Sequence, residues 1–306
     1  MKNVPIVVFG YNRPRLFKQV MESILKAVEK QKIYIILDGS KGDMDKKQVD
    51  QVLEIAKNIT YLNHELVSSK KNLGLTNRII SGLNYVFSKE PNAIILEDDT
   101  LPSNGFIYFC SELLDRFKDD KRIYHISGCN NFPSFNKTDY SYFFSMFHEI
   151  WGWATWADRW KNFQLYPENT NDFGNDLVKE YFKKIPRTMR YWNFSLKNFN
   201  YSSTPDTWDF SWRYSCLKHG GLSVIPTQNM ISNIGIGPDA THTTSQTTQG
   251  PHAPRYSFTE FSHQNKIRLD YNYDKKVAKR KYPTPLETTV SRNYSKVKRL
   301  IDKVLN

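Results

Sequence analysis

Apolar runs long enough for buried strands alternate with helical patterns in the N-terminal part of the chain (1–130), and this alternation constrains the fold most strongly. The runs are "PIVVF" (5–9), "IYIILD" (33–38), "AIIL" (93–96) and "RIYHIS" (122–127), with "ITYLNHELV" (59–67) a further candidate. Continuous apolar runs are typical of parallel strands covered on both faces. Between them, apolar residues recur at helical spacing. This order predicts an α/β fold, a mostly parallel, doubly wound sheet with helices on both faces.

Carboxylates follow two of these predicted strands. Asp38 ends the second run, and Glu97, Asp98 and Asp99 directly follow "AIIL". Ligands of open parallel sheets bind beyond the carboxyl ends of the strands, so we expect these side chains to line one crevice. Adjacent carboxylates repel and raise one another's pKa. A hard divalent cation, Mg²⁺ or Mn²⁺, would offset that repulsion and neutralise a bound pyrophosphate; the alternative is an exposed acidic turn.

The segment "YNRP" after the first strand supplies two candidate donor-binding residues, Asn12 and Arg13. Arg13 is suited to pack on or bond to a nucleotide, and Asp38 is suited to accept a hydrogen bond from a base or ribose. Taken singly, Asp38 is equally well explained as a helix cap and Arg13 as a surface charge. Together with the acidic triplet they describe a nucleotide-diphosphate site.

The segment "TWDFSW" (207–212) combines two aromatic planes with a carboxylate. A sugar ring stacks well on Trp208, and Asp209 beside it could take a proton from an attacking hydroxyl group. The alternative is a helix on which Trp208 and Trp212 anchor the core at positions i and i+4, with Asp209 as a cap. The segment alone does not separate these interpretations.

A glycine-rich loop, "NIGIGPDATHT" (233–243), contains His242. This histidine could complete a metal shell or contact the pyrophosphate, although a single histidine is more often structural or exposed. The polar residues 241–254 that follow are interpreted as a flexible lid or connector.

The net charge of +12 is concentrated at the C-terminus, where residues 266–306 hold 12 Lys and Arg against 4 Asp and Glu. The segment 291–306 predicts a short basic amphipathic helix suited to an anionic membrane surface. We expect a cytoplasmic protein with reduced thiols, because the sequence has three widely spaced cysteines, no apolar run of spanning length and no signal peptide. Because of the basic helix, we expect it to be peripheral on the inner face of the membrane.

In their order, "YNRP", "LDGS", "IILEDDTLPSNGFIYF", "GWATW", "TWDFSW" and "NIGIGPDATHT" resemble a known enzyme family. They are similar to motifs of the inverting GT-A glycosyltransferases related to animal N-acetylglucosaminyltransferase I, and to bacterial sugar transferases of that superfamily. The similarity covers roughly Val4 to Thr243. It implies a GT-A, Rossmann-like fold and transfer of a sugar from a nucleotide-diphosphate donor.

The resemblance also implies donor-binding roles. Arg13 and Asp38 would contact the nucleobase, Glu97 and Asp98 would hold ribose, sugar or metal-bound water, and Asp99 would ligate the metal directly.

For the acceptor half, the resemblance makes Asp209 the catalytic base, places Trp208 near the donor sugar, and orders the loop with His242 over the pyrophosphate. The sequence departs from the family at Thr76, which stands where the family has a donor-contacting histidine. The nucleotide contacts are therefore expected to differ from those of the family.

We accordingly expect a GT-A catalytic domain over residues 1–265, with a nucleotide-binding half (1–130) and an acceptor half (131–265), and a basic tail over residues 266–306. The predicted function is metal-dependent, inverting transfer from a UDP-sugar, such as a UDP-N-acetylhexosamine, to a glycan or lipid-linked acceptor in bacterial surface polysaccharide synthesis. The alternatives are a sugar nucleotidyltransferase, a carbohydrate-binding module, or a nucleic-acid-binding protein. The last leaves the acidic triplet without a role, so no nucleic-acid partner is expected.

Overall fold

The computed structural model describes residues 3–132, 139–168, 173–203, 208–235 and 260–282. The first half alternates strictly between strands and helices, as the sequence predicts. Its elements are β1 (Ile6–Gly10), α1 (Pro14–Ala27), β2 (Ile33–Leu37), α2 (Asp43–Lys57), β3 (His64–Ser68), α3 (Leu75–Phe87) and β4 (Asn92–Glu97).

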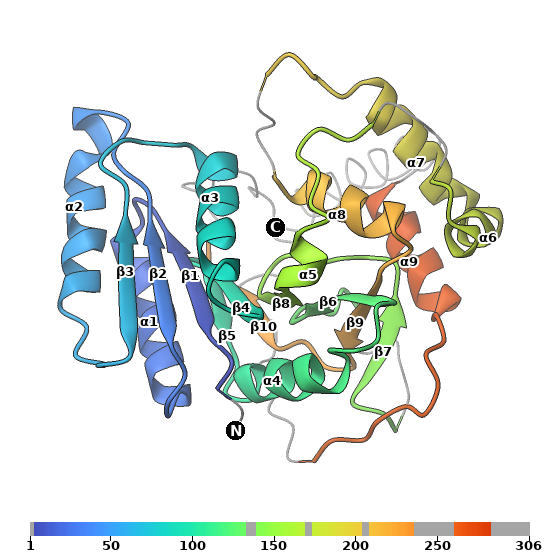
Figure 1. Cartoon of the computed structure of the whole chain (residues 1–306), viewed down its shortest axis with the longest axis horizontal. Coiled ribbons are helices and arrows are strands. Elements are labelled where there is room, and N and C mark those ends of the chain that lie inside the picture. The colour runs from blue at the N-terminus through green and yellow to red at the C-terminus, as the bar shows by residue number, and fades with distance from the viewer. Residues whose placement is uncertain (1–2, 133–138, 169–172, 204–207, 236–259, 283–306) are drawn as a thin grey trace, which may run out of the picture.

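The second half is more irregular. Its elements are β5 (Thr100–Pro102), α4 (Phe106–Arg116), β6 (Ile123–Ser127), β7 (Tyr142–Ser145), β8 (Trp153–Trp156), α5 (Ala157–Trp160), α6 (Asp176–Lys184), α7 (Pro186–Lys197), α8 (Trp208–Lys218), β9 (Leu222–Pro226), β10 (Ile231–Asn233) and α9 (Tyr271–Lys281). Figure 1 shows the two halves side by side around one sheet.

The main sheet has eight strands in the order β3-β2-β1-β4-β8-β6-β9-β7. Strands β1, β2, β3, β4, β6 and β9 share one direction, and β8 and β7 run against them. The predicted mostly parallel α/β sheet is thus confirmed. From β1 the chain builds outward to β3 and then returns to the other side of β1 as β4. The gap beyond the carboxyl ends of β1 and β4 is therefore a topological switch point, where such sheets bind ligands.

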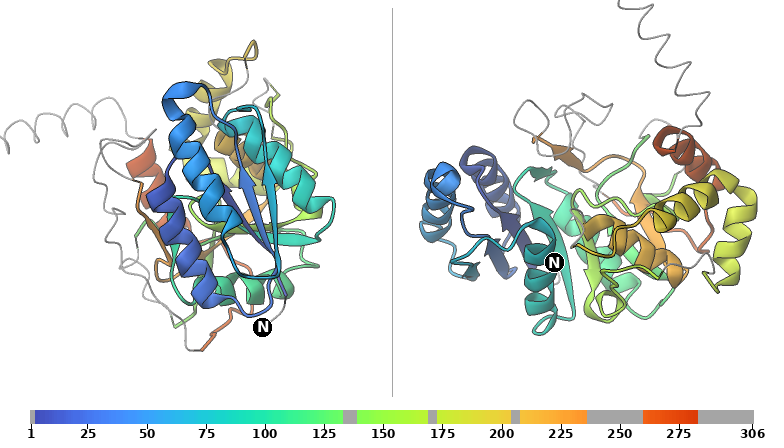
Figure 2. Two further views of the ribbon diagram at one scale, coloured as in Figure 1. Left: turned by 90° about the vertical axis from the view of Figure 1, so that its left-hand side faces the viewer. Right: turned by 90° about the horizontal axis from the view of Figure 1, so that it is seen from above.

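Helices cover both faces of the sheet. Successive strand residues point to opposite sides, and on β1 the residues on both sides are apolar and buried. On β1, Ile6 and Val8 belong to the core beneath α1, α2 and α4, whereas Val7 and Phe9 belong to the core beneath α3 and α8. Figure 2 shows α1 and α2 on one side of the strands and α3 on the other. The doubly wound arrangement expected from the sequence is therefore present.

A second sheet contains only β5 and β10, which pair antiparallel with Thr100 opposite Asn233. This pairing brings a segment from much later in the chain directly against the turn after β4. The sequence contains little sign of either strand, because each is only three residues long.

Residues beyond 265 also contribute to the core. Tyr273, Val277 and Ala278 of α9 are buried with the main sheet, and Leu269 forms a bridge with Phe144 of β7. The basic region predicted from residue 266 therefore begins with a packed helix. The predicted amphipathic helix over residues 291–306 lies outside the described residues. Within the described ranges, no helix has the length and apolarity that crossing a bilayer requires.

Candidate functional site

A pocket of about 470 Å³ lies at the switch point between β1 and β4. Its walls come from the ends of β1, β2 and β4, from α3 and α8, and from the chain after β10. Eight of the residues predicted from the sequence line it: Asn12, Arg13, Asp38, Glu97, Asp98, Asp99, Trp208 and Asp209. His242 lies outside the described residues.

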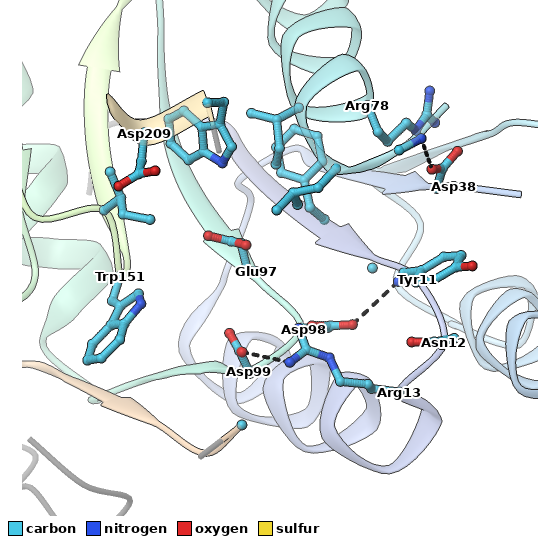
Figure 3. Close-up of a pocket in the computed structure, with 18 of the residues that line it drawn as sticks. Tyr11, Asn12, Arg13, Asp38, Arg78, Glu97, Asp98, Asp99, Trp151 and Asp209 are labelled. Atoms are coloured by element: carbon cyan, nitrogen blue, oxygen red, sulfur yellow. Dashed lines mark hydrogen bonds and ion pairs between the residues drawn. The ribbon is translucent and has the colours of Figure 1, made fainter. Parts of the chain in front are cut away.

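Figure 3 shows that the pocket-lining residues lie on two sides of the acidic triplet. Asp38 and Tyr11 lie on one side of the acidic triplet, near Arg78, and Asp209 and Trp151 lie on the other. This single pocket therefore has two sides that meet at the carboxylates, and we call them its compartments: one contains Asp38, Tyr11 and Arg78, and the other contains Asp209 and Trp151.

The acidic triplet begins with Glu97, the last residue of β4, and a tight turn holds it in place. The Thr100 hydroxyl accepts a hydrogen bond from the Glu97 amide (2.7 Å) and donates one to the Glu97 carbonyl (2.9 Å). The Ile234 amide donates to the Asp99 carbonyl (2.8 Å), so the chain after β10 holds the turn from the other side. These hydrogen bonds to the backbone of Glu97 and Asp99 direct three successive carboxylates around the pocket floor.

Arg13 is the protein's own counter-ion for this triplet. Its guanidinium pairs with Asp98 and, at 2.8 Å between Nη1 and Oδ2, with Asp99. Although burial opposes the charged form, Asp98 and Asp99 raise the pKa of Arg13. The two simpler interpretations do not apply, since Arg13 is no free surface charge and the triplet is no exposed turn.

The triplet remains short of positive charge even with Arg13 present. Burial, and then the charges of Asp99 and Asp98, raise the pKa of Glu97 to about 8. Burial also raises the pKa of Asp98 to about 6 against the opposing effect of Arg13. Within the described part of the chain, no hydrogen bond reaches the Glu97 carboxylate. The site therefore favours an additional cation.

Gly235 closes the pocket over Asp99. A Cβ atom at this position would lie 2.4 Å from Asp99 Oδ2 and 3.0 Å from Arg13 Nη1. The Gly235 amide donates to the Asn233 side chain (2.9 Å), which fixes the chain in this close approach. The first glycine of the predicted glycine-rich loop is therefore in contact with the acidic cluster.

Asp38 holds the loop before α3. Its carboxylate accepts hydrogen bonds from the amides of Gly39 (2.9 Å), Leu73 (3.0 Å) and Gly74 (3.1 Å). This arrangement is close to the capping role considered from the sequence, although the bonds join the end of β2 to a distant loop. Asp38 still lines the pocket, so it positions the loop at the point where a ligand would lie.

Arg78, which no sequence motif marks, lines the same compartment. It lies on the buried face of α3 with 8% of its surface exposed, and burial lowers its pKa. One guanidinium nitrogen, Nη2, donates to the Val67 carbonyl (2.5 Å), but the buried Nε has no partner within the described residues. The one signal in the sequence is an arginine, one turn before Gly82, inside an apolar helical stripe.

Asp209 stands in the first turn of α8, at the other end of the pocket. It forms an ion pair with Arg213, one helical turn later. The adjacent Trp208 is 2% exposed and stacks on Trp153 at 5.6 Å between ring centroids. The structure thus joins the two interpretations of "TWDFSW", because Trp208 is a core anchor and also part of the pocket wall.

Trp212 fixes the orientation of α8. Its ring lies 5.5 Å from that of Trp153, and its Nε1–H donates to His125 Nδ1 (3.2 Å). His125 therefore carries its proton on Nε2 and donates to the Glu149 carbonyl (2.9 Å). Burial lowers the pKa of His125 to about 3, so the ring is neutral in this chain of bonds. Asp209 is consequently presented by a helix with a rigid anchor.

Trp151 is the accessible tryptophan of the pocket. It is only half-buried and lies across the carboxylates from Arg13, near Asp209 (Figure 3). The segment before it is held by Glu149, which pairs with Lys281 of α9 (2.6 Å) and accepts from Asn131 (2.9 Å). Trp151 directly precedes the motif "GWATW", and that position is the one signal for it in the sequence.

The carboxylates provide the oxygen ligands that Mg²⁺ and Mn²⁺ prefer. Among the described residues, no hydrogen-bond donor reaches the Glu97 carboxylate, whereas the Asp99 carboxylate pairs with Arg13. No three His, Cys, Asp or Glu side chains among the described residues are grouped closely enough to hold a metal by themselves. The residues therefore fit a cation that completes its coordination with substrate oxygens.

No protein-family model matches the chain, and a search of curated proteins finds no match. Among solved structures, it is similar to the mannosyltransferase PcManGT from Pyrobaculum calidifontis in complex with GDP-Man and Mn²⁺, with 14% identity, a TM-score of 0.42, and coverage of 70% of this chain and 69% of the other.

An active-site mutant of LgtC is also similar, with 8% identity, a TM-score of 0.34, and coverage of 71% and 85%. So is 4-diphosphocytidyl-2C-methyl-D-erythritol synthase from Anaerococcus prevotii DSM 20548, with 9% identity, a TM-score of 0.32, and coverage of 70% and 99%. At these similarities, no activity or ligand of these proteins carries over to this chain.

Proposed function

We propose that this protein is a glycosyltransferase that moves a sugar from a nucleotide-diphosphate donor to a hydroxyl group of a glycan acceptor. The observation that carries the proposal is the two-compartment pocket at the switch point. One compartment has the groups to bind a nucleotide, the other has a carboxylate beside an accessible tryptophan, and the charged cluster lies between them. A diphosphate bridging the compartments would place the sugar beside Asp209.

In this proposal the sugar donor binds along Asn12, Arg13, Asp38 and the triplet. Arg78 adds a hydrogen-bond donor on the Asp38 side of the pocket, where the nucleotide would lie. Arg13 pairs with Asp98 and Asp99 in the free protein and lines the pocket, and in this proposal it transfers one of its bonds to a phosphate oxygen of the sugar donor. A guanidinium suits this exchange because it binds carboxylates and phosphates with the same geometry. A UDP-sugar, such as a UDP-N-acetylhexosamine, is the first candidate donor.

Asp209 accepts the proton of the acceptor hydroxyl group while the oxygen of that hydroxyl group attacks the anomeric carbon of the donor sugar. The bond from that carbon to the diphosphate breaks, and the bonding electrons leave with the nucleoside diphosphate. Attack from the face opposite the leaving group inverts the anomeric configuration. Before the step, the acceptor must replace Arg213 as one partner of the Asp209 carboxylate. Trp151 provides an apolar surface on which the acceptor ring packs.

Asp99, with Glu97 beside it and His242 as a further candidate ligand, would hold a Mn²⁺ or Mg²⁺ ion. The ion would stabilise negative charge on the departing diphosphate. We further propose that the acceptor is a glycan or lipid-linked glycan of bacterial surface polysaccharide synthesis, and that the enzyme works at the cytoplasmic face of the membrane.

A sugar nucleotidyltransferase is the main rival, because it would also bind a nucleotide at this edge of the sheet. Such an enzyme requires a glycine-rich phosphate loop after β1, and the turn here, "GYNRP", has a single glycine, Gly10. The two activities differ in their products. A glycosyltransferase releases nucleoside diphosphate when donor and acceptor are mixed, whereas a nucleotidyltransferase releases pyrophosphate from a nucleoside triphosphate and a sugar phosphate.

A thermal-shift screen of nucleotide sugars with and without MnCl₂ tests the proposal. A ligand present at 100 times its Kd adds about 2.7 kcal/mol to the free energy of unfolding, which raises the Tm by several degrees. We expect a shift that requires both nucleotide sugar and Mn²⁺ and disappears in Asp99→Asn. The control Asp50→Asn changes an exposed α2 carboxylate paired with Lys46 and should behave like wild type. An equal shift in Asp99→Asn would contradict the proposed ligand, and no shift with any nucleotide sugar would contradict the proposed function.

A further inference from the structure

Helix α7 exposes a large apolar side chain on its outer face. Its inner face buries Thr188, Trp192 and Leu196 at intervals of four residues. Opposite them, Phe194 has 69% of its surface in contact with solvent. Figures 1 and 2 place α6, α7 and α9 together at the end of the molecule opposite α2.

Basic side chains accompany this apolar group. Arg190 and Lys197 are exposed on the same side of the helix as Phe194, and the α7 sequence "PRTMRYWNFSLK" has no acidic residue. Helix α2 makes the contrast. It exposes Met44 at 97%, but it carries four acidic and three basic residues. A single exposed apolar side chain is ordinary, whereas its combination with exclusively positive charge distinguishes α7.

Helix α9 extends the positive region. It contacts α7 through Arg187, whose Nη1 donates to the carbonyls of Lys279 and Tyr282 (both 3.4 Å), and through the stacked rings of Tyr191 and Tyr282, 3.8 Å apart. The helix has five basic residues, of which Lys281 pairs with Glu149, and its one acidic residue, Asp274, is completely buried. The solvent side of α7 and α9 is therefore positive.

We propose that the outer face of α7 (Arg190, Phe194 and Lys197), supported by the charge of α9, binds the surface of an anionic lipid bilayer. Lys and Arg attract anionic headgroups, and apolar side chains on the same helix insert at the boundary between headgroups and acyl chains. The chain also continues from α9 to Asn306 through a segment in which the sequence predicts a second basic amphipathic helix.

This surface lies one helix away from the pocket wall. Trp192 on the inner face of α7 contacts Phe210 of α8 at 5.0 Å and Tyr214 at 6.2 Å between ring centroids. Phe210 directly follows Asp209. Given the proposed function, a bilayer bound at α7 would bring lipid-linked acceptors to the Asp209 side of the pocket.

Sedimentation of the full-length protein with vesicles tests this proposal. Vesicles of phosphatidylcholine mixed with phosphatidylglycerol, which is anionic, are compared with vesicles of pure phosphatidylcholine. We expect binding to the anionic vesicles only. Phe194→Ser, and separately Arg190→Glu with Lys197→Glu, should each weaken binding by about tenfold or more, because both changes lie in the contact surface.

Matched controls are Met44→Ser, which replaces an exposed apolar residue with serine, and the pair Lys46→Glu with Lys47→Glu, which reverses two exposed positive charges, both on α2. They should bind like wild type. Equal weakening by the α2 charge pair would indicate general attraction and overturn the proposal, as would wild-type binding by the α7 variants or no binding to anionic vesicles. Nucleotide binding and circular dichroism should be unchanged in the α7 variants, so the result is independent of whether the proposed transferase activity is correct.

Discussion

Arg13 shows how one residue changes the interpretation of an acidic motif. From the sequence, three adjacent carboxylates indicate a bound cation. In the structure, the guanidinium of Arg13 already pairs with two of them, Asp98 and Asp99. The remaining carboxylate, Glu97, has a pKa raised to about 8 because burial and its two neighbours oppose its charge. A divalent cation and a nucleotide would therefore have to exchange bonds with Arg13, so we expect the two ligands to bind cooperatively.

Asp209→Asn tests the assignment of the base at the residue scale. Asparagine keeps the size of the side chain but cannot accept the acceptor's proton. We expect transfer to fall by about 10²–10⁴-fold, the usual contribution of general-base catalysis, with donor affinity within about twofold of wild type. Initial-rate assays and calorimetry measure the two effects separately. Transfer at the wild-type rate would remove Asp209 from its proposed role.

Short elements decide the shape of the pocket, and they are the elements that the sequence predicts least well. The regular apolar spacing predicts a helix over residues 75–87, and α3 lies there. Strand β10 has no such signal, since three residues carry no period, yet its pairing with β5 positions Gly235 against Asp99. Helices α6 and α7 likewise lie in a stretch whose sequence is recognisable only as polar and aromatic.

Gly235→Ala is predicted to disturb the site through this element. The added Cβ would meet Asp99 Oδ2 at 2.4 Å, so Asp99 or the backbone after β10 must move. We expect the affinity for nucleotide and Mn²⁺ to fall by about tenfold, which is about 1.4 kcal/mol, with little change in Tm. Isothermal titration and a thermal melt provide the two values.

The matched control is Gly42→Ala, where a Cβ would meet no atom within 4 Å and the backbone is extended at φ 171°. This variant should bind the ligands as wild type does. Wild-type affinity in Gly235→Ala would show that Asp99 tolerates displacement or does not participate in binding.

At the scale of the whole molecule, two buried neutral histidines join separate elements of the second half of the sheet. His125 bonds to Trp212 of α8, and His148 Nε2 donates to the Gly221 carbonyl (2.9 Å), with the two imidazole rings 5.6 Å apart. Burial lowers the pKa of His148 to about 4, and that of His125 to about 3. Each must stay neutral for the core to remain closed.

His148→Gln is predicted to flatten the dependence of stability on pH. As the pH falls below about 6.5, the unfolded chain protonates its histidine while folded His148 stays neutral until about pH 4. The wild type should therefore lose about 1.4 kcal/mol per pH unit over that interval through this residue, and the variant should lose less.

Urea titrations between pH 4 and pH 7.5 measure the effect. Glutamine can still donate to Gly221, so the variant is expected to fold. Identical slopes for wild type and His148→Gln would contradict the prediction.

The sequence alone determined the α/β class, the strand ends that carry carboxylates, and eight of the residues that line the pocket. It could do so because buried strands and amphipathic helices have local periods, and because parallel strands bring their carboxyl ends to one edge. Only the tertiary structure decided that Arg13 pairs with two carboxylates of the triplet, that Arg78 and Trp151 belong to the pocket, and that Gly235 touches Asp99. Those facts depend on contacts between residues far apart in the chain, where side-chain packing and charge pairing leave no local pattern.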